Sequence, residues 1–144
     1  MYFCFTIDST KKAIHNSLKV NKAALRVSDN ATELVDLIVD SISDKKGEEI
    51  VSIDLRKVDD AVADFFVLCH ASTGIQIKSI AEHIEFNVLT QMSERPWRKE
   101  GLRNLEWVLL DYVNVVVHIF LKSKRSFYQL EELWSDGVLT EFED

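Results

Sequence analysis

Residues 100–134 read EGLRNLEWVLLDYVNVVVHIFLKSKRSFYQLEELW, and this stretch decides the fold of the chain. Two apolar runs, 107–112 and 115–121, are separated only by Val113 and Asn114. A two-residue connection between strand-sized runs predicts a β-hairpin and fixes which residues face each other across it. The segment after the hairpin predicts a closing helix that starts at Ser123 and ends at Gly137. The side chains expected to point inward from this helix are Phe127, Leu130, Leu133 and Trp134.

The two faces of the predicted hairpin differ in character. One face is almost wholly apolar and is expected to be core; it carries Val108, Leu110, Tyr112, Val115, Val117 and Ile119. The other face pairs Trp107 with Phe120, Leu109 with His118, and Asp111 with Val116. Because Trp is enriched at interface hot spots, Trp107 is the leading candidate anchor for a protein partner. If a helix covers this face, Trp107 and Phe120 belong to the core instead.

The predicted partner-binding residues are therefore Trp107, Asp111, His118 and Phe120, with Glu100 as a weaker candidate in the preceding turn. His118 and Asp111 share a face but occupy different cross-strand pairs, which favours a structural or partner-facing histidine over a catalytic one.

Upstream of the hairpin, residues 31–92 predict helix, strand, strand and helix in that order. Asn30 and Glu33 have the spacing of a capping box before a helix of about 14 residues. Residues 50–56 alternate as a half-buried strand, and 65–71 are apolar on both faces, as in a central strand. Thr73 and Gln76 form a second capping pair, opening a helix that should run to about Met92.

The connections between these elements predict a mixed sheet. The link over residues 57–64 is too short for a parallel crossover, so the two strands are expected to be antiparallel if adjacent. A long helix then separates the second strand from the hairpin, which predicts a right-handed crossover. The expected fold is a single α/β domain with a mixed sheet of about four to five strands covered by helices. The order of elements also resembles the nucleotidyltransferase-like topology.

Composition limits the classes of partner. The chain has 144 residues and a net charge of −7, but residues 1–30 carry five basic and two acidic side chains while residues 31–144 carry twelve and twenty-two. An acidic body repels phosphates, so a protein partner is expected rather than sequence-specific binding of nucleic acid. No apolar run reaches the roughly 18 residues of a membrane span. Two distant cysteines, Cys4 and Cys69, indicate a reducing cytoplasm.

Residues 1–30 show only weak helical spacing, in Ile14, Leu18 and Leu25. A flexible extension, an extra helix docked on the body, a mis-assigned start and a targeting peptide are the alternatives. Targeting peptides are rich in Arg and poor in acids, whereas Lys dominates here and Asp8 lies near the start. We expect residues 1–30 to be an extension, and residues 31–144 to form the domain.

The sequence contains no pattern that indicates catalysis. Nucleotidyltransferases need a Gly-Ser turn followed by paired carboxylates for metal ions, but Ser72-Thr73-Gly74 replaces that turn and Asp54 stands alone on its strand. Cys69 and His70 are adjacent in a strand and so point to opposite faces. The four histidines lack metal-ligand spacing, and no phosphate-binding loop is present. We expect no catalytic residue, no metal and no cofactor.

The ordered motifs of the chain resemble the ribosome silencing factor (Iojap-related) family over about residues 31–137. The motifs that carry this resemblance are IDL at 53–55, ADFFV at 63–67, EG at 100–101, EWVLLDY at 106–112 and RSFYQLEELW at 125–134. Val113 departs from the family pattern, which usually has Gly there. Because a β-branched residue disfavours positive φ, the turn geometry is the weak point of the predicted hairpin.

This resemblance implies a protein without catalytic activity. Members of the family bind the large ribosomal subunit through its protein number fourteen, block joining of the small subunit and slow translation when nutrients are scarce. Two alternatives remain open. One is a metal-dependent nucleotidyl or phosphoryl transferase using Asp54, Asp64 and Asp111; the other is a homodimeric adaptor, since a second copy of the chain could pair with it when free.

Overall fold

Six strands form one mixed sheet in the order β3-β4-β5-β2-β1-β6, in a computed structural model that describes residues 30–142. The strands are β1 (Glu48–Asp54), β2 (Phe65–Ala71), β3 (Arg98–Glu100), β4 (Trp107–Asp111), β5 (Val115–Leu121) and β6 (Val138–Glu141). The helices are α3 (Ala31–Asp44), α4 (Gly74–Met92), α5 (Lys122–Tyr128) and α6 (Leu130–Leu133). The central pair β2 and β5 is parallel, and every other neighbouring pair is antiparallel.

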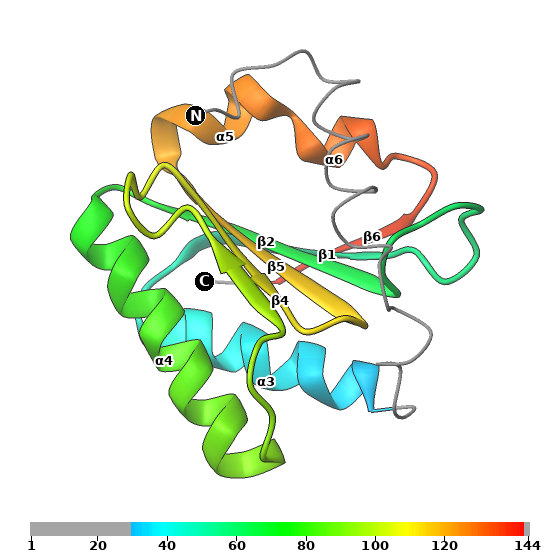
Figure 1. Cartoon of the computed structure of the whole chain (residues 1–144). Helices are drawn as coiled ribbons and strands as arrows, with labels where there is room; N and C mark the ends of the chain where they lie inside the picture. Colours follow the sequence, from blue (N-terminus) through cyan, green and yellow to red (C-terminus); the bar gives the residue numbers. More distant parts are fainter. Residues whose placement is uncertain (1–29, 143–144) are drawn as a thin grey trace.

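Helices cover both faces of this sheet (Figure 1). α3 and α4 lie against one face, and α5 and α6 lie against the other. Successive residues of β2 therefore enter different cores: Val67 packs in the core beneath α3 and α4, whereas Phe66 and Leu68 pack in the core that contains Leu130 and Trp134. A strand covered on both faces has to be apolar throughout, which is the pattern that predicted β2 as central.

The β4–β5 hairpin has the predicted register. Trp107 is opposite Phe120, Leu109 is opposite His118, and Asp111 is opposite Val116. The loop has two residues as predicted, because the Tyr112 N–H donates to the Val115 carbonyl at 2.9 Å across it. Its conformation is unusual, since Val113 has a φ of 75° and the Asn114 N–H donates to the Tyr112 carbonyl at 2.9 Å. These are the features of a γ-turn with positive φ, a rare conformation for a β-branched residue.

The predicted antiparallel pair and the mixed sheet are confirmed, but the number of strands is higher than predicted. β1 and β2 are antiparallel neighbours, and the sheet is mixed. The predicted four to five strands become six because two short edge strands, β3 and β6, were missed. β3 has only three residues, too few for an alternating pattern to be recognised, and all four residues of β6 are exposed, so β6 does not alternate at all.

Neither predicted capping box is complete, and only Thr73 caps its helix. The Gln76 backbone N–H donates to Thr73 Oγ1 at 3.2 Å, which caps α4. The Gln76 side chain does not complete the box, and donates instead to the carbonyls of Lys45 and Lys46 after α3. Asn30 precedes α3 but makes no side-chain cap hydrogen bond.

The predicted single helix from Ser123 to Gly137 is wrong. α5 begins at Lys122, and the chain breaks at Gln129, where φ is 46°, before the short α6. This break turns Phe127 outward, with 61% of its surface exposed, although it was expected to point inward. Leu130 and Trp134 are buried as predicted, and Leu133 packs against the same core while partly exposed.

The predicted extension over residues 1–30 lies outside the described residues, apart from Asn30. The division into an extension and a domain over residues 31–144 stays a prediction.

Candidate partner-binding site

Four of the five predicted partner-binding residues are buried. The exposed fractions are 1% for Trp107 and Asp111 and 0% for His118 and Phe120. Of the two alternatives for this face of the hairpin, the core alternative holds, because the segment after β5 folds back over this side of the sheet. Phe66 and Trp134 pack edge to face there, with ring centroids 5.4 Å apart. A role of these residues in partner binding stays a prediction.

Trp107 is the centre of an aromatic cluster that anchors α5. Its indole Nε1–H donates to His118 Nδ1 at 3.0 Å, and its ring stacks on Phe120 with centroids 5.1 Å apart. The ring of Tyr128, at the end of α5, lies 4.6 Å from the Trp107 ring. Burial lowers the pKa of His118 to about 3, so its imidazole is neutral and can accept the indole proton.

Asp111 stabilises the hairpin turn. Its Oδ1 accepts the Val113 N–H at 2.7 Å, which supports the positive φ of that residue. The Asp111 carbonyl oxygen accepts the Trp97 N–H at 2.7 Å. One residue therefore connects the turn to the chain that enters the edge strand β3.

Glu100, the fifth predicted residue, lies on β3 at the edge of the sheet. Its side chain is 37% exposed and pairs with Arg98 at 3.0 Å. Gly101 follows with a φ of 84°, and a Cβ atom there would overlap the carbonyl oxygen of Trp107. Glycine is thus required where the chain leaves β3, which explains the acidic-Gly pair in the sequence.

Exposed apolar side chains at both ends of β3 were missed by the sequence interpretation. Trp97 precedes the strand and is 39% exposed, and Leu102 follows it and is 37% exposed. Lys99, between them, forms an ion pair with Glu85 of α4 at 3.1 Å. Three strand residues give no periodicity, so the only available signal was the presence of a Trp next to a Pro and a basic pair.

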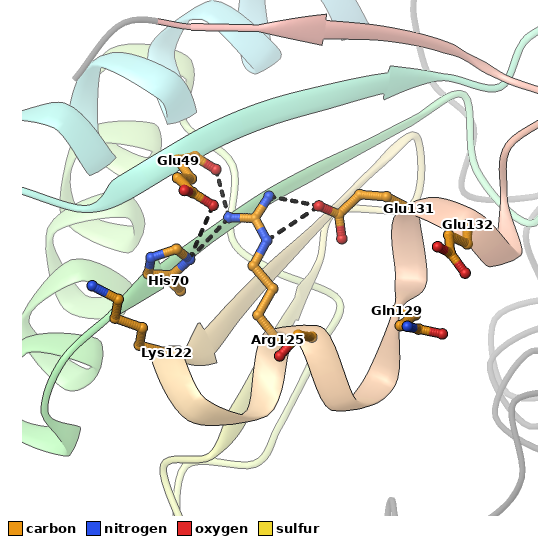
Figure 2. A pocket seen from close by; sticks show the side chains of 8 residues that line it. Glu49, His70, Lys122, Arg125, Gln129, Glu131 and Glu132 are labelled. Atoms are coloured by element: carbon orange, nitrogen blue, oxygen red, sulfur yellow. Dashed lines mark hydrogen bonds and ion pairs between the residues drawn. The ribbon is translucent and has the colours of Figure 1, made fainter.

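Arg125 is a second residue whose role the sequence did not reveal. It follows Lys122 and Lys124 in a basic run, a pattern typical of a solvated face, yet only 7% of its surface is exposed. Its Nη1 donates to the Glu49 carbonyl at 2.6 Å and lies 3.1 Å from His70 Nδ1, and its Nη2 lies 2.9 Å from Glu131 Oε2 (Figure 2). This guanidinium connects α5 to β1, β2 and α6.

A pocket of about 470 Å³ opens beside Arg125. It is lined by Glu49, His70, Lys122, Arg125, Ser126, Gln129, Glu131 and Glu132. Burial lowers the pKa of His70, and the charge of Arg125 lowers it further, while Glu49 and Glu48 oppose both effects. The Arg125 guanidinium already contacts Glu49, His70 and Glu131. We therefore interpret these residues as structural contacts between elements and not as a ligand-binding site.

Cys69 and His70 point to opposite faces of β2, as predicted. Cys69 lies in the core beneath α3 and α4, where burial raises the pKa of its thiol to about 12. His70 lies beside Arg125 on the other face. A thiol this difficult to ionise and remote from its neighbour's imidazole is a core residue and not a nucleophile.

The carboxylates of the alternative transferase site are not arranged for metal binding. Arg56 hydrogen-bonds the Asp54 carboxylate with its Nη2 2.7 Å from Oδ2, and so lowers the pKa of that carboxyl. Asp111 is buried and supports the hairpin turn. Within residues 30–142, no three His, Cys, Asp or Glu side chains gather in a way that could hold a metal ion. No helix of this part of the chain is both long and apolar enough to cross a membrane.

The described residues thus define a small α/β domain whose sheet is covered on both faces and whose β3 edge carries exposed Trp97 and Leu102. The family described as "Ribosomal silencing factor during starvation" matches residues 28–144. The chain belongs to this family, which confirms the resemblance seen in its motifs.

Individual relatives agree with this assignment. A "Ribosomal silencing factor RsfS" of Halalkalibacterium halodurans is 37% identical over 111 residues, which are 77% of this chain and 93% of that protein. A "Protein Iojap, chloroplastic" of Zea mays is 32% identical over 77 residues, 51% of this chain and 32% of that protein. The structure is also similar to the crystal structure of a Bacillus halodurans protein, with a TM-score of 0.66 and 34% sequence identity. The match covers 77% of this chain and 99% of the chain in that crystal structure.

Proposed function

We propose that this protein silences ribosomes by binding the large ribosomal subunit through its protein number fourteen and blocking the joining of the small subunit. Its membership of the ribosomal silencing factor family over residues 28–144 is the observation that carries this proposal. Translation would be repressed when nutrients are limited. The mechanism is steric occlusion in the cytoplasm, so it needs no catalytic residue and no cofactor.

We place the contact with the ribosomal protein at the β3 edge. Trp97 and Leu102 are exposed at either end of the strand, and Glu100 lies between them. In the described part of the sheet no strand pairs with the outer side of β3, so its backbone can accept a strand from a partner. A second copy of the chain could occupy the same edge while the protein is free.

The buried predicted residues would support this surface indirectly. The Trp97 N–H is held by the Asp111 carbonyl, and Gly101 packs against the Trp107 carbonyl. Trp107 and Asp111 are both on β4, the strand that pairs with β3. We therefore assign Trp107, Asp111, His118 and Phe120 a positioning role, and Trp97 the role of anchor.

The first test is co-sedimentation of the purified chain with isolated large subunits. We expect Trp97→Ala to weaken binding by about tenfold or more, because a central Trp at an interface contributes about 2 kcal/mol or more. The same variant should lose its ability to prevent added small subunits from forming complete ribosomes, which is measured on sucrose gradients.

Phe127→Ala is the matched control. Phe127 is an exposed aromatic residue on α5, at the opposite end of the hairpin from Trp97, and 61% of its surface is exposed. We expect it to bind like the unmodified chain. Equal binding by Trp97→Ala would remove the β3 edge from the site, and the absence of any binding to large subunits would refute the proposed function itself.

A further inference from the structure

The outer surface of the α3–α4 layer has two adjacent ridges of different chemistry. The ridge on α3 is acidic, because Glu33, Asp36, Asp40 and Asp44 recur three or four residues apart and are all exposed. Residues 31–44 contain no Lys or Arg. Side chains at this spacing lie on one side of a helix, so α3 presents a row of carboxylates opposite its buried side.

The ridge on α4 is mostly apolar, although the exposed Glu82 lies between Ile75 and Phe86 on the same side of the helix. Ile75 is 84% exposed, Phe86 is 64% exposed and Leu89 is 39% exposed, although α4 already buries Ile77, Ile80 and Ile84 on its inner side. Large apolar side chains that are exposed near one another often mark an interaction surface. Within residues 30–142, nothing covers these three side chains, since all of them remain exposed.

The two ridges lie side by side. His83 of α4 is 3.1 Å from Asp44 of α3, and the Asn87 side chain donates to Ser41 at 2.9 Å. These contacts join the two helices along their length. The helices run antiparallel, because the later residue of α4 contacts the earlier residue of α3. An occupant of this surface must therefore carry a basic row next to an apolar row.

We infer that residues 11–26 of this same chain dock on the surface formed by α3 and α4. This segment, KKAIHNSLKVNKAALR, has five basic side chains and no acidic one. Ile14, Leu18 and Leu25 supply apolar groups at helical spacing. The charge of +5 in the segment faces the four carboxylates of α3, and its apolar residues face Ile75 and Phe86.

The length of the chain permits this docking. Arg26 is followed by only Val27, Ser28 and Asp29 before Asn30 begins the described part, immediately ahead of α3. Four residue steps reach about 13 Å, which exceeds the roughly 8–10 Å between packed helices. The segment can therefore turn back along α3. Family membership begins at residue 28, so this contact would belong to the present chain and not to the family fold.

Trypsin provides a direct test, because it cleaves after the five basic residues of the segment. In the full-length chain, Asp36→Asn with Asp40→Asn should raise the rate of cleavage within residues 11–26 several-fold, since docking is what protects these bonds. Phe86→Gln should raise it as well. The matched control is Asp59→Asn with Asp136→Asn, which removes the same charge from exposed positions outside α3 and α4 and should leave the rate unchanged.

A cross-link identifies the occupant. Carbodiimide should join Lys19 or Lys22 to Asp36 or Asp40 in a dilute mixture of ¹⁴N and ¹⁵N chains, with both partners of each link carrying the same isotope. Links between differently labelled chains would show that a second copy occupies the surface and would overturn the inference. So would cleavage that is insensitive to the α3 substitutions, or that responds equally to the control pair.

Discussion

At the scale of single residues, Trp107 lies between Phe120 and Tyr128 with its indole N–H bonded to His118. A Trp in this setting stabilises the fold, because its ring fills the core and its only donor has a partner. His118 also has a structural role, since its Nδ1 accepts the hydrogen bond from the Trp107 indole and burial lowers its pKa so that the imidazole is neutral. Neither side chain is available to a partner in the folded domain.

We expect Trp107→Ala to lower the free energy of unfolding by about 3–5 kcal/mol, since it removes a fully buried ring and leaves His118 Nδ1 without its donor. Urea denaturation followed by circular dichroism measures the change. Phe127→Ala removes an aromatic ring that is 61% exposed and should change the same quantity by no more than about 0.5 kcal/mol. Similar losses in both variants would contradict the buried role of Trp107.

The neutral state of His118 also predicts a pH dependence of stability. In the unfolded chain His118 takes up a proton near its ordinary pKa of 6.5, but in the folded protein only near about 3. Between these values the unfolded state binds more protons, so acidification through this range favours unfolding by up to about 1.4 kcal/mol per pH unit.

The contribution of His118 is isolated by comparison with His118→Asn. Between about pH 7 and pH 5.5, the free energy of unfolding should fall by roughly 1 kcal/mol less in this variant than in the unmodified chain. Urea titrations at the two pH values give the difference. An identical fall in both proteins would show that the folded-state pKa of His118 is not depressed.

At the scale of elements, the segment from α5 to α6 is held to the sheet by Arg125. α5 has seven residues and α6 has four, and the chain between them passes through Gln129 at a positive φ. Helices this short have little stability of their own. The contacts of Arg125 with Glu49, His70 and Glu131 therefore act together with the aromatic cluster of Trp107 and Tyr128 to fix where the segment lies.

Replacing Arg125 with Met should destabilise this segment. The substitution retains most of the buried stem but leaves the Glu49 carbonyl and Glu131 without their donor. We expect a loss of about 2 kcal/mol or more, reduced from the value for a fully buried pair because Glu131 is 31% exposed. Hydrogen exchange should accelerate at the amides of α5 and α6.

Lys122→Met is the matched control, because Lys122 begins α5 and its side chain is 62% exposed. Exchange in α5 and α6 should remain close to that of the unmodified chain. If Arg125→Met left this exchange unchanged, the segment would have to be held by the aromatic cluster of Trp107 and Tyr128 alone.

At the scale of the whole molecule, the functional surfaces separate by position on the sheet. The β3 edge carries exposed Trp97 and Leu102 and is the proposed contact with the large subunit. The α3–α4 layer carries the acidic and apolar ridges on one face, while α5 and α6 close the other face (Figure 1). Because these surfaces are separate, the proposed contact of the β3 edge with the large subunit and the inferred docking of residues 11–26 on the α3–α4 layer can form at the same time.

The order of the elements, the mixed sheet and the β4–β5 register could all be predicted from the sequence. Each depends on local information. Apolar periodicity identifies β2 and α4, and loop length predicts the relative direction of neighbouring strands. The short connection between β4 and β5 fixes their cross-strand pairs, such as Trp107 with Phe120 and Asp111 with Val116. The family resemblance was also readable, because it rests on ordered motifs.

The tertiary structure alone decided which of these residues are exposed. The face of the hairpin that carries Trp107 and His118 is buried because α5 and α6 fold back over it, and that return depends on Gln129 and on the contacts of Arg125 with residues distant in sequence. β3 and β6 likewise form by pairing with neighbouring strands and not by any pattern of their own. Whether a residue is buried depends on which other segments pack against it. The local sequence around a strand carries no information about those distant segments.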